Sequence, residues 1–413
     1  MLAGRGKGAL ALGAGLYIVA WGFGTSELFA AALGLMLLPA AAWLWVRFMA
    51  RPMTMRRRTG NRELVEGGRV EVQLEVRSDE GPLPSRAVVV ERVAGLPERD
   101  VPVVRSGHEL RGRYTLEDVP RGRYALEAAD LVLGDPFGLA EARIALERRD
   151  TLLVYPRVFD LDGVFTDAGA AGGDEGRALL HRTAGYDLHS IRDFQQGESL
   201  RRVHWRSTAK RRKLMVKELT ETPRDEAAVL LDGERITAVG PRGASSYDAS
   251  VRAAASLLSR MVTLGQRCSL VLHGSSRQRL RIQAGGGEWG SVMAALAAVE
   301  PDAERPLHVM LRDLIAGSGA AESVDAARLF VVSAALTPAL ADRLLALRSY
   351  RRDIALVWVD APTFAGRTTS HGPEEAASLQ LARAGVPVAR LRAGDDVGAV
   401  LSATTVAREY AHA

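Results

Sequence analysis

The chain has 413 residues, which is long enough for two or three domains, and its 47% hydrophobic content excludes a fully disordered protein. A net charge of +5 is modest for this length, so charge alone does not indicate a nucleic-acid-binding protein. The single cysteine, Cys268, excludes an intrachain disulfide and a multi-cysteine metal site, which fits a reducing compartment.

Two apolar runs open the chain, at residues 9–23 and 28–46, with residues 24–27 between them. Each run is close to the lower limit of the roughly 17 to 25 residues that span a bilayer. Arg5 and Lys7 precede the first run, so a signal peptide is the alternative interpretation. A second run follows at once without a small-residue cleavage site, which favours a hairpin of two transmembrane helices over residues 1–50.

The basic residues around this hairpin predict its orientation. Glu27 is the only charged residue in the short turn, whereas basic residues flank both outer ends of the pair. The positive-inside rule then places both termini and everything after about residue 50 in the cytoplasm, with the hairpin in an inner or plasma membrane. The basic residues are Arg5, Lys7, Arg47, Arg51, Arg56, Arg57 and Arg58.

Residues 60–156 change to a period of two. Val70, Val72, Leu74 and Val76 alternate with polar residues, as in a strand with one buried and one exposed face. Turns rich in Pro, Gly and Asp separate several such runs. The pattern predicts an antiparallel β-sandwich of the immunoglobulin-like class. The further predicted strands are 86–93, 110–116, 123–129, 139–146 and 152–155.

Residues 157–185 contain a Gly- and Ala-rich run and are predicted to be a linker. Residues 222–413 then alternate apolar strands with amphipathic helices, which predicts a doubly wound α/β domain with a mostly parallel sheet covered on both faces. The predicted strands are 227–231, 269–272, 279–283, 329–332, 354–359 and 386–391. The predicted helices are 248–264, 288–299, 337–349, 374–384 and 397–407.

Asp232 leaves the first strand of this sheet at the end where open α/β sheets place their ligand sites. The position resembles the start of the metal site of von Willebrand factor A domains, whose pattern is Asp-x-Ser-x-Ser and whose oxygen ligands suit magnesium. Glu234 and Ile236 stand at the two serine positions, and Ile236 offers no ligand atom. The sequence therefore favours a degenerate site, in which Asp232 caps or hydrogen-bonds a loop, over a functional magnesium site.

Other candidate motifs carry less information. Gly285, Gly287 and Gly290 match a dinucleotide-binding pattern, but Trp289 would crowd a pyrophosphate and no suitable acid follows. A glycine-rich turn is the favoured interpretation, and no cofactor is predicted. The histidines of the central segment show no metal-ligand spacing, which favours structural or surface roles. They are His181, His189 and His204.

Residues 186–221 form the most information-dense segment. Eight Lys or Arg residues lie between Arg201 and Lys217, with Trp205 among them and acidic residues at both ends. Three interpretations are open: a solvated face with salt bridges, a nucleic-acid or anionic-lipid site, and a structured module of turn, helix, basic loop and strand (214–219). The near absence of other aromatic residues disfavours nucleic acid. A fixed frame of Arg and Trp suits docking to an acidic protein surface.

These residues resemble the signature of the domain of unknown function 58 family, approximately R-x-Y-x-P-G-D-D-x-R-x-I-D-W-x-x-x-A-R…L-x-V-R-E. The segments Asp135-Pro136-Phe137-Gly138-Leu139 and Val154-Tyr155-Pro156 resemble the part of the family that precedes it. The positions carried over as signature or interaction residues are Tyr186, Arg192, Asp193, Gly197, Glu198, Arg201, Arg202, His204, Trp205, Ala209, Lys210, Val216 and Glu218.

The chain departs from the pattern at three charged positions. Glu198 and His204 stand where the family has Asp, and Lys210 stands for Arg. A catalytic Asp-Trp pair would therefore be impaired here, and no catalytic residue is predicted. The resemblance implies a bacterial membrane protein that partners a MoxR-type AAA+ ATPase, often alongside a membrane transglutaminase-like protein. We therefore expect a non-enzymatic adaptor; the alternatives are a magnesium-dependent module or enzyme centred on Asp232, and polyanion binding by the basic loop.

Overall fold

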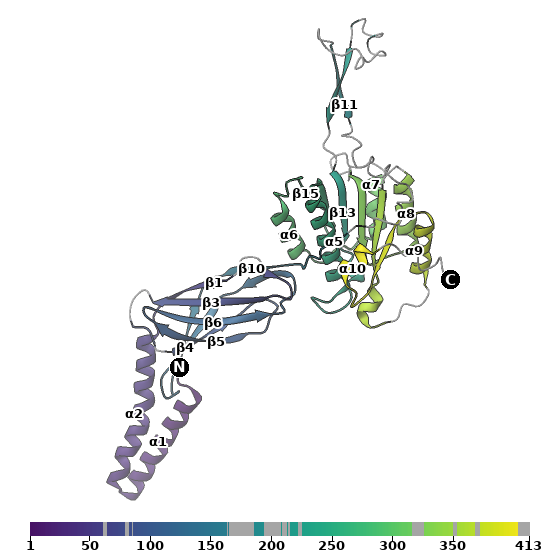
Figure 1. Ribbon diagram of the computed structural model, residues 1–413. Coiled ribbons are helices and arrows are strands. Elements are labelled where there is room, and N and C mark those ends of the chain that lie inside the picture. Colours follow the sequence, from purple (N-terminus) through teal and green to yellow (C-terminus); the bar gives the residue numbers. More distant parts are fainter. Residues whose placement is uncertain are drawn as a thin grey trace. The chain divides into compact units, whose positions relative to one another are not determined.

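The computed structural model describes residues 1–60, 64–78, 82–84, 86–162, 164, 186–193, 208, 213, 215–221, 225–315, 326–349, 353–367 and 372–403 (Figure 1). The chain divides into two compact units, Met1–Tyr155 and Pro156–Ala413. The first contains two apolar helices and a curled antiparallel β domain, and the second is an α/β region.

The chain begins with a helical hairpin, α1 (Gly4–Phe23) and α2 (Ser26–Met49). Both helices are long and apolar enough to cross a membrane by length and composition, with mean hydropathies of 1.2 and 1.9. They pack closely because Gly13 faces Ala32 and Met36, where an added Cβ would lie 2.8 Å from the Met36 side chain. Tyr17 and Phe29 add an edge-to-face ring contact at 5.1 Å.

The β domain is built from two sheets. A seven-stranded antiparallel sheet has the order β1-β3-β6-β5-β4-β8-β9, and contacts between β1 and β9 show that it curls until its two ends meet. A small sheet has the order β2-β10-β7, in which β10 pairs with β2 in parallel and with β7 antiparallel. The strands are β1 (Met53–Thr59), β2 (Leu64–Val65), β3 (Arg69–Ser78), β4 (Arg86–Glu91), β5 (Arg99–Ser106), β6 (Glu109–Glu117), β7 (Gly122–Leu126), β8 (Ala129–Gly134), β9 (Glu141–Leu146) and β10 (Asp150–Tyr155).

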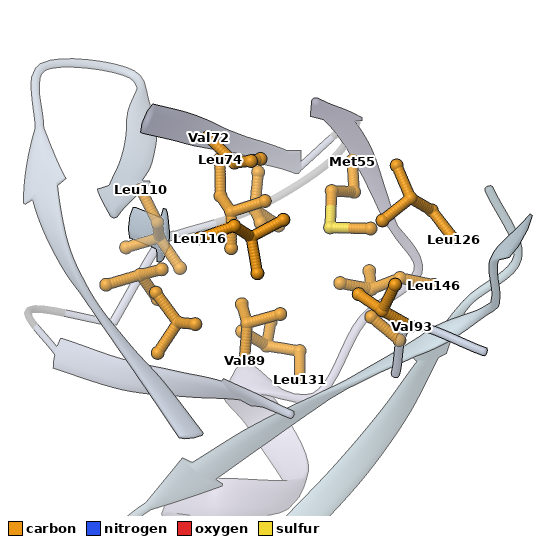
Figure 2. Packing of buried hydrophobic residues seen from close by; sticks show 14 of the residues in the cluster. Met55, Val72, Leu74, Val89, Val93, Leu110, Leu116, Leu126, Leu131 and Leu146 are labelled. Atoms are coloured by element: carbon orange, nitrogen blue, oxygen red, sulfur yellow. The ribbon is translucent and has the colours of Figure 1, made fainter. Parts of the chain in front are cut away.

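Alternation along the strands supplies the core of this domain. Val70, Val72 and Leu74 of β3 are buried and alternate with exposed residues, as the period of two predicts. Figure 2 shows Val72 and Leu74 in the same cluster as Leu116 of the neighbouring strand β6 and Leu131 of β8. One continuous apolar core therefore holds the curled sheet together.

Strand β1 was missed because three consecutive arginines follow its first residues. The arginines were assigned to the basic flank of the hairpin, yet Met53 and Met55 are buried in the core. The side chain of Arg57 is also buried, and its guanidinium donates to both carboxylate oxygens of Glu91 at 3.0 and 3.1 Å. Strand β5 was missed as well, and the predicted strand 123–129 is divided between β7 and β8.

The α/β region is organised around a six-stranded sheet with the order β15-β14-β13-β16-β17-β18. All neighbouring strands are parallel except β15, which runs antiparallel to β14 at the edge. The strands are β13 (Asp225–Asp232), β14 (Cys268–His273), β15 (Gln278–Ile282), β16 (Ala326–Ser333), β17 (Asp353–Val359) and β18 (Val388–Leu391).

Helices cover both faces of this sheet (Figure 1). Apolar side chains of α7, α8 and α9 pack on one face in a cluster that includes Leu230, Val331 and Leu356. On the other face α5 contacts β13, β14, β16 and β17, while α10 packs on α5 and β18, and α6 on α5 and β15. The helices are α5 (Ser246–Thr263), α6 (Trp289–Ala298), α7 (Leu307–Ile315), α8 (Pro338–Ser349), α9 (Pro373–Arg383) and α10 (Val397–Ser402), with short 3₁₀ turns η2 (Arg235–Thr237) and η3 (Ala361–Ala365).

The beginning of the predicted linker packs against the α/β domain. The Phe159 N–H donates to the Ser256 hydroxyl of α5 at 3.0 Å, and Arg260 of α5 donates to the Asp162 carbonyl at 3.1 Å. Leu161 and Val164 are buried. These first residues of the predicted linker therefore pack on the α/β domain, and their apolar side chains follow no strand or helix period in the sequence. Residues 165–185 of the predicted linker lie outside the described residues.

Candidate functional site

The described part of the signature segment forms two antiparallel strands, β11 (Tyr186–Asp193) and β12 (Met215–Glu221). Strand β12 matches the predicted strand at 214–219, whereas β11 was not predicted. Tyr186, Arg192 and Asp193 lie in β11, and Val216 and Glu218 lie in β12; the register places Arg192 opposite Val216. The predicted helix and basic loop lie outside the described residues apart from Thr208 and Lys213. The remaining signature residues also lie outside them: Gly197, Glu198, Arg201, Arg202, His204, Trp205, Ala209 and Lys210.

The two signature strands are joined to the amino end of β13, because β12 ends at Glu221 and β13 begins at Asp225. Asp232 leaves the carboxyl end of the same strand. Parallel strands align their carboxyl ends, so Asp232 belongs to the edge of the sheet that is opposite to the signature connection. The chain thus has two separate candidate regions, connected through one central strand.

Asp232 lies where the strand order reverses, since the chain runs outward from β13 to β14 and β15 and then returns to β16 on the other side. Its side chain is buried and both carboxylate oxygens are engaged. Oδ1 is 2.7 Å from Nδ1 of His273 and accepts the Glu234 N–H at 3.2 Å. Oδ2 accepts the Ser333 hydroxyl at 2.6 Å. Because a carboxylate only accepts hydrogen bonds, Nδ1 of His273 carries the proton.

The loop after β13 is fixed by backbone contacts. The Gly233 N–H donates to the His273 carbonyl at 2.9 Å, and a Cβ at Gly233 would lie 2.4 Å from that carbonyl oxygen, so only glycine fits. The Ala303 N–H donates to the Gly233 carbonyl at 2.9 Å. Ile236 stands at the second serine position of the von Willebrand pattern. In this loop its side chain is 82% exposed.

Glu234 stands at the first serine position of the von Willebrand pattern, and its side chain contacts the start of α7. Its carboxylate accepts a hydrogen bond from the Leu307 N–H at the start of that helix. Burial raises the pKa of Glu234 above its ordinary value, and the nearby charge of Asp232 acts in the same direction. Glu234 is therefore held as a helix cap.

A pocket of about 570 Å³ opens beside this cluster. His273, Arg277 and Arg305 supply its nitrogen-bearing side chains, and Val309 and Met310 supply an apolar wall. The remaining lining residues are Gly274, Ser275 and Glu304.

Asp302 fixes the loop on the strand β14 side of this pocket. Its carboxylate accepts the Ser275 hydroxyl at 2.6 Å and the Ser275 N–H at 3.0 Å. The hydrogen bond from Ser275 lowers the pKa of Asp302. Asp302 is thus ionised at neutral pH and holds the loop in place.

Comparison with known proteins decides the family. The family model described as "Protein of unknown function DUF58" matches residues 190–404, which is more than half of the chain. The chain belongs to the DUF58 family. "Uncharacterized protein YeaD" of Bacillus subtilis (strain 168) is 26% identical over 200 residues, which is 48% of this chain and 48% of that protein. The DUF58 chain therefore spans about half of the length of the curated relative it matches.

Two solved structures show low similarity to this DUF58 chain. An aerotolerance-related membrane protein from Bacteroides fragilis NCTC 9343 is 12% identical, with a TM-score of 0.29 over 43% of this chain and 94% of that chain. Cwp6 from Clostridium difficile is 8% identical, with a TM-score of 0.16 over 81% of this chain and 49% of that chain. Scores this low do not establish a common fold.

The glycine motif of this DUF58 protein lies between β15 and α6. Strand β15 is the antiparallel edge strand, so its carboxyl end lies at the edge opposite to Asp232. Gly286 adopts a φ of +68° and its N–H donates to the Gln283 carbonyl at 2.9 Å, which is turn geometry. The motif thus has the local form of a tight turn and lies away from the point where the strand order reverses.

Sequence reasoning did not predict His273 or Ser333 as partners of Asp232; the strand end at Ser333 was considered only for a carboxylate, which it lacks. Both end strands that read as plain apolar runs, and a polar residue at such an end carries no meaning until the strand order is known. Once β14 and β16 are placed on either side of β13, both residues must lie beside Asp232. Among the residues that the structure describes, no group of three or more His, Cys, Asp or Glu side chains could hold a metal ion. His189 lies in β11, and His181 and His204 lie outside the described residues.

Proposed function

We propose that this protein is a membrane-tethered, non-enzymatic scaffold whose cytoplasmic α/β domain docks a partner protein through the signature segment. The observation that carries this proposal is the internal pairing of Asp232: its two oxygens are occupied by His273, Ser333 and a backbone N–H. A carboxylate committed in this way supports a structural role at the position where a related site would bind a metal.

The finer assignment of the domains belongs to the same proposal. The strand order of the sheet, with one antiparallel edge strand and Asp232 leaving the first strand, supports a von Willebrand A-like domain. The seven-stranded antiparallel sheet and the small mixed sheet share one core, which supports an immunoglobulin-like sandwich, although β2 and β10 pair in parallel.

The orientation rests on the basic residues. Arg5 follows α1's first residue and Arg47 lies in the last turn of α2, so both basic ends belong to the same end of the hairpin. The positive-inside rule supports placing this end, and with it both termini, in the cytoplasm. There a MoxR-type AAA+ ATPase, and in the same complex a membrane transglutaminase-like protein, would reach the signature segment.

The test is co-purification of a MoxR-type ATPase with the detergent-solubilised full-length chain, both tagged and co-expressed. The Arg201→Ala, Arg202→Ala, Trp205→Ala triple variant is expected to lower ATPase recovery about tenfold or more, as loss of an Arg and Trp anchor does at other interfaces. The Arg211→Ala, Arg212→Ala variant, which removes the same number of positive charges nearby, is the matched control and is expected to retain the partner.

Recovery that falls equally in both variants would indicate a general charge effect and would favour the polyanion alternative. That alternative further requires binding to anionic vesicles or nucleic acid that weakens steeply with salt. Equal recovery with the wild type and the triple variant would contradict docking through the signature.

The pocket beside His273 favours a second candidate function, namely an anion-binding module next to Asp232; a magnesium-dependent module centred on Asp232 is the other form of this candidate. Two arginines and an imidazole line the pocket, which suits an anion better than a cation. This candidate predicts that millimolar inorganic phosphate or magnesium raises the melting temperature of the chain, and that Arg305→Ala or Asp232→Ala respectively removes the rise.

A further inference from the structure

The segment Asp135-Pro136-Phe137-Gly138-Leu139 forms a rigid loop whose role the docking function does not explain. The buried carboxylate of Asp135 accepts the N–H groups of Phe137, Leu139 and Ala140 at 2.8, 2.6 and 2.5 Å. Gly138 takes a φ of +68°, which closes the turn. This geometry leaves the Phe137 side chain 68% exposed at the tip.

The loop is bonded to the base of the helical hairpin. Leu2 and Ala140 form an antiparallel bridge, in which the Ala3 N–H donates to the Leu139 carbonyl at 2.9 Å and the Glu141 N–H donates to the Met1 carbonyl at 2.8 Å. Ala140 is buried and packs against Ala42 and Val46 of α2. The loop is thus held where α1 begins and α2 ends.

This end of the hairpin has the features of a membrane interface. Val46 lies three residues before the last residue of α2, or about 4.5 Å along the axis at the helical rise. The exposed side chains of Trp43, Trp45 and Phe48 lie within one helical turn of it. Trp, Tyr and basic side chains are enriched where spans meet the headgroups. Arg47 lies 5.9 Å above the ring of Trp43, and Arg51 lies 5.4 Å above the ring of Phe48.

We propose that the 135–140 loop is a third membrane contact, which inserts Phe137 into the interfacial layer of the leaflet at the hairpin base. A single exposed phenylalanine on a soluble surface needs no explanation. Phe137 differs because its loop is fixed to both helices at the depth where aromatic side chains partition. The contact would hold the β domain against the bilayer surface. This inference rests on the proposed membrane tether.

Spin labelling of the full-length protein in phosphatidylcholine and phosphatidylglycerol vesicles tests the proposal. The only native cysteine, Cys268, is fully buried, so labels can be placed at Phe137→Cys with little background. Leu44→Cys, 63% exposed on α2, is the lipid control, and Ile236→Cys, 82% exposed in the α/β domain, is the water control. The readout is the ratio of collision rates with oxygen and with a water-soluble nickel chelate.

The expected ratio at position 137 lies well above that of position 236 and approaches that of position 44. A ratio at 137 equal to that at 236, with position 44 reading as lipid, overturns the third contact and leaves the tether intact. If position 44 also reads as water, the tether itself is wrong and the proposal falls with it.

Discussion

Two aspartates leave parallel strands at the same edge of the α/β sheet, and their partners differ. Asp360 follows β17 and is fully buried; Arg390 of β18 donates to its Oδ2 from Nε at 3.1 Å and from Nη2 at 2.8 Å. That guanidinium also lies 4.4 Å from the ring of Trp358. Asp232, almost as buried, is paired with a histidine and a serine.

The two aspartates occupy equivalent positions in the sheet but have different partners. Both carboxylates sit where open α/β sheets place ligands. A permanent cation neutralises Asp360, whereas Asp232 pairs with an imidazole, a hydroxyl and a backbone N–H. Asp360 is therefore fixed as a structural ion pair. Asp232 is held by hydrogen bonds beside a pocket.

The largest expected effect is at the ion pair. Arg390→Ala leaves the Asp360 charge buried without its guanidinium and is expected to cost about 3–5 kcal/mol of unfolding free energy. Urea denaturation of the solubilised chain, followed in the α/β unit, measures it. Arg328→Ala removes one partner of the exposed Arg328–Asp353 pair and serves as control, with an expected cost below about 1 kcal/mol. Equal losses in the two variants would mean that burial does not distinguish these pairs.

Asp232→Ala is expected to cost less, about 3 kcal/mol, because it removes two side-chain hydrogen bonds to a charged acceptor at about 1.5 kcal/mol each. The same denaturation experiment checks it. An unchanged or increased stability would indicate that Asp232 is strained and kept for a function, as in a site that awaits a ligand.

Ser333→Ala tests one half of that network. Loss of the 2.6 Å hydrogen bond to Asp232 is expected to cost about 1.5 kcal/mol. Ser349→Ala, which removes an exposed hydroxyl that donates to the Ala346 carbonyl, is the control, with an expected change within about 0.5 kcal/mol. Equal free energies of unfolding in the two serine variants would show that the hydrogen bond from Ser333 to Asp232 does not stabilise the fold.

The smallest effect concerns Glu234, whose pKa is raised chiefly by burial. A raised pKa means that the folded state favours protonated Glu234. The contribution of Glu234 to the free energy of unfolding is therefore fully present below the ordinary pKa of 4.5 and is lost as pH rises through the pKa of the folded state. Glu234→Gln is expected to flatten that decline by less than about 1 kcal/mol, since solvent screens a partly exposed group. Melting temperatures at pH 4 and pH 7 for both proteins measure it; parallel declines would contradict the assignment.

The sequence predicted those helices and strands whose own residues show an apolar run or an amphipathic period. Continuous apolar runs such as the one that ends at Leu231 gave the strands of the sheet, and the spacing around Val251 and Leu258 gave α5. The nine-residue α7 is too short for a periodic signal, and Pro306 before it reads as a break. At the candidate site Asp232 was found, but His273 and Ser333 were not, because their role depends on strand order. The arginines of β1 were misassigned because the ion pair that buries Arg57 is made with a residue 34 positions away.

A magnesium titration of the full-length chain tests most directly whether Asp232 is structural. We expect millimolar magnesium to change the melting temperature of the wild type and of Asp232→Asn by the same small amount, because both oxygens of Asp232 are already occupied. A rise confined to the wild type and abolished in Asp232→Asn would contradict it and would favour a metal-dependent module.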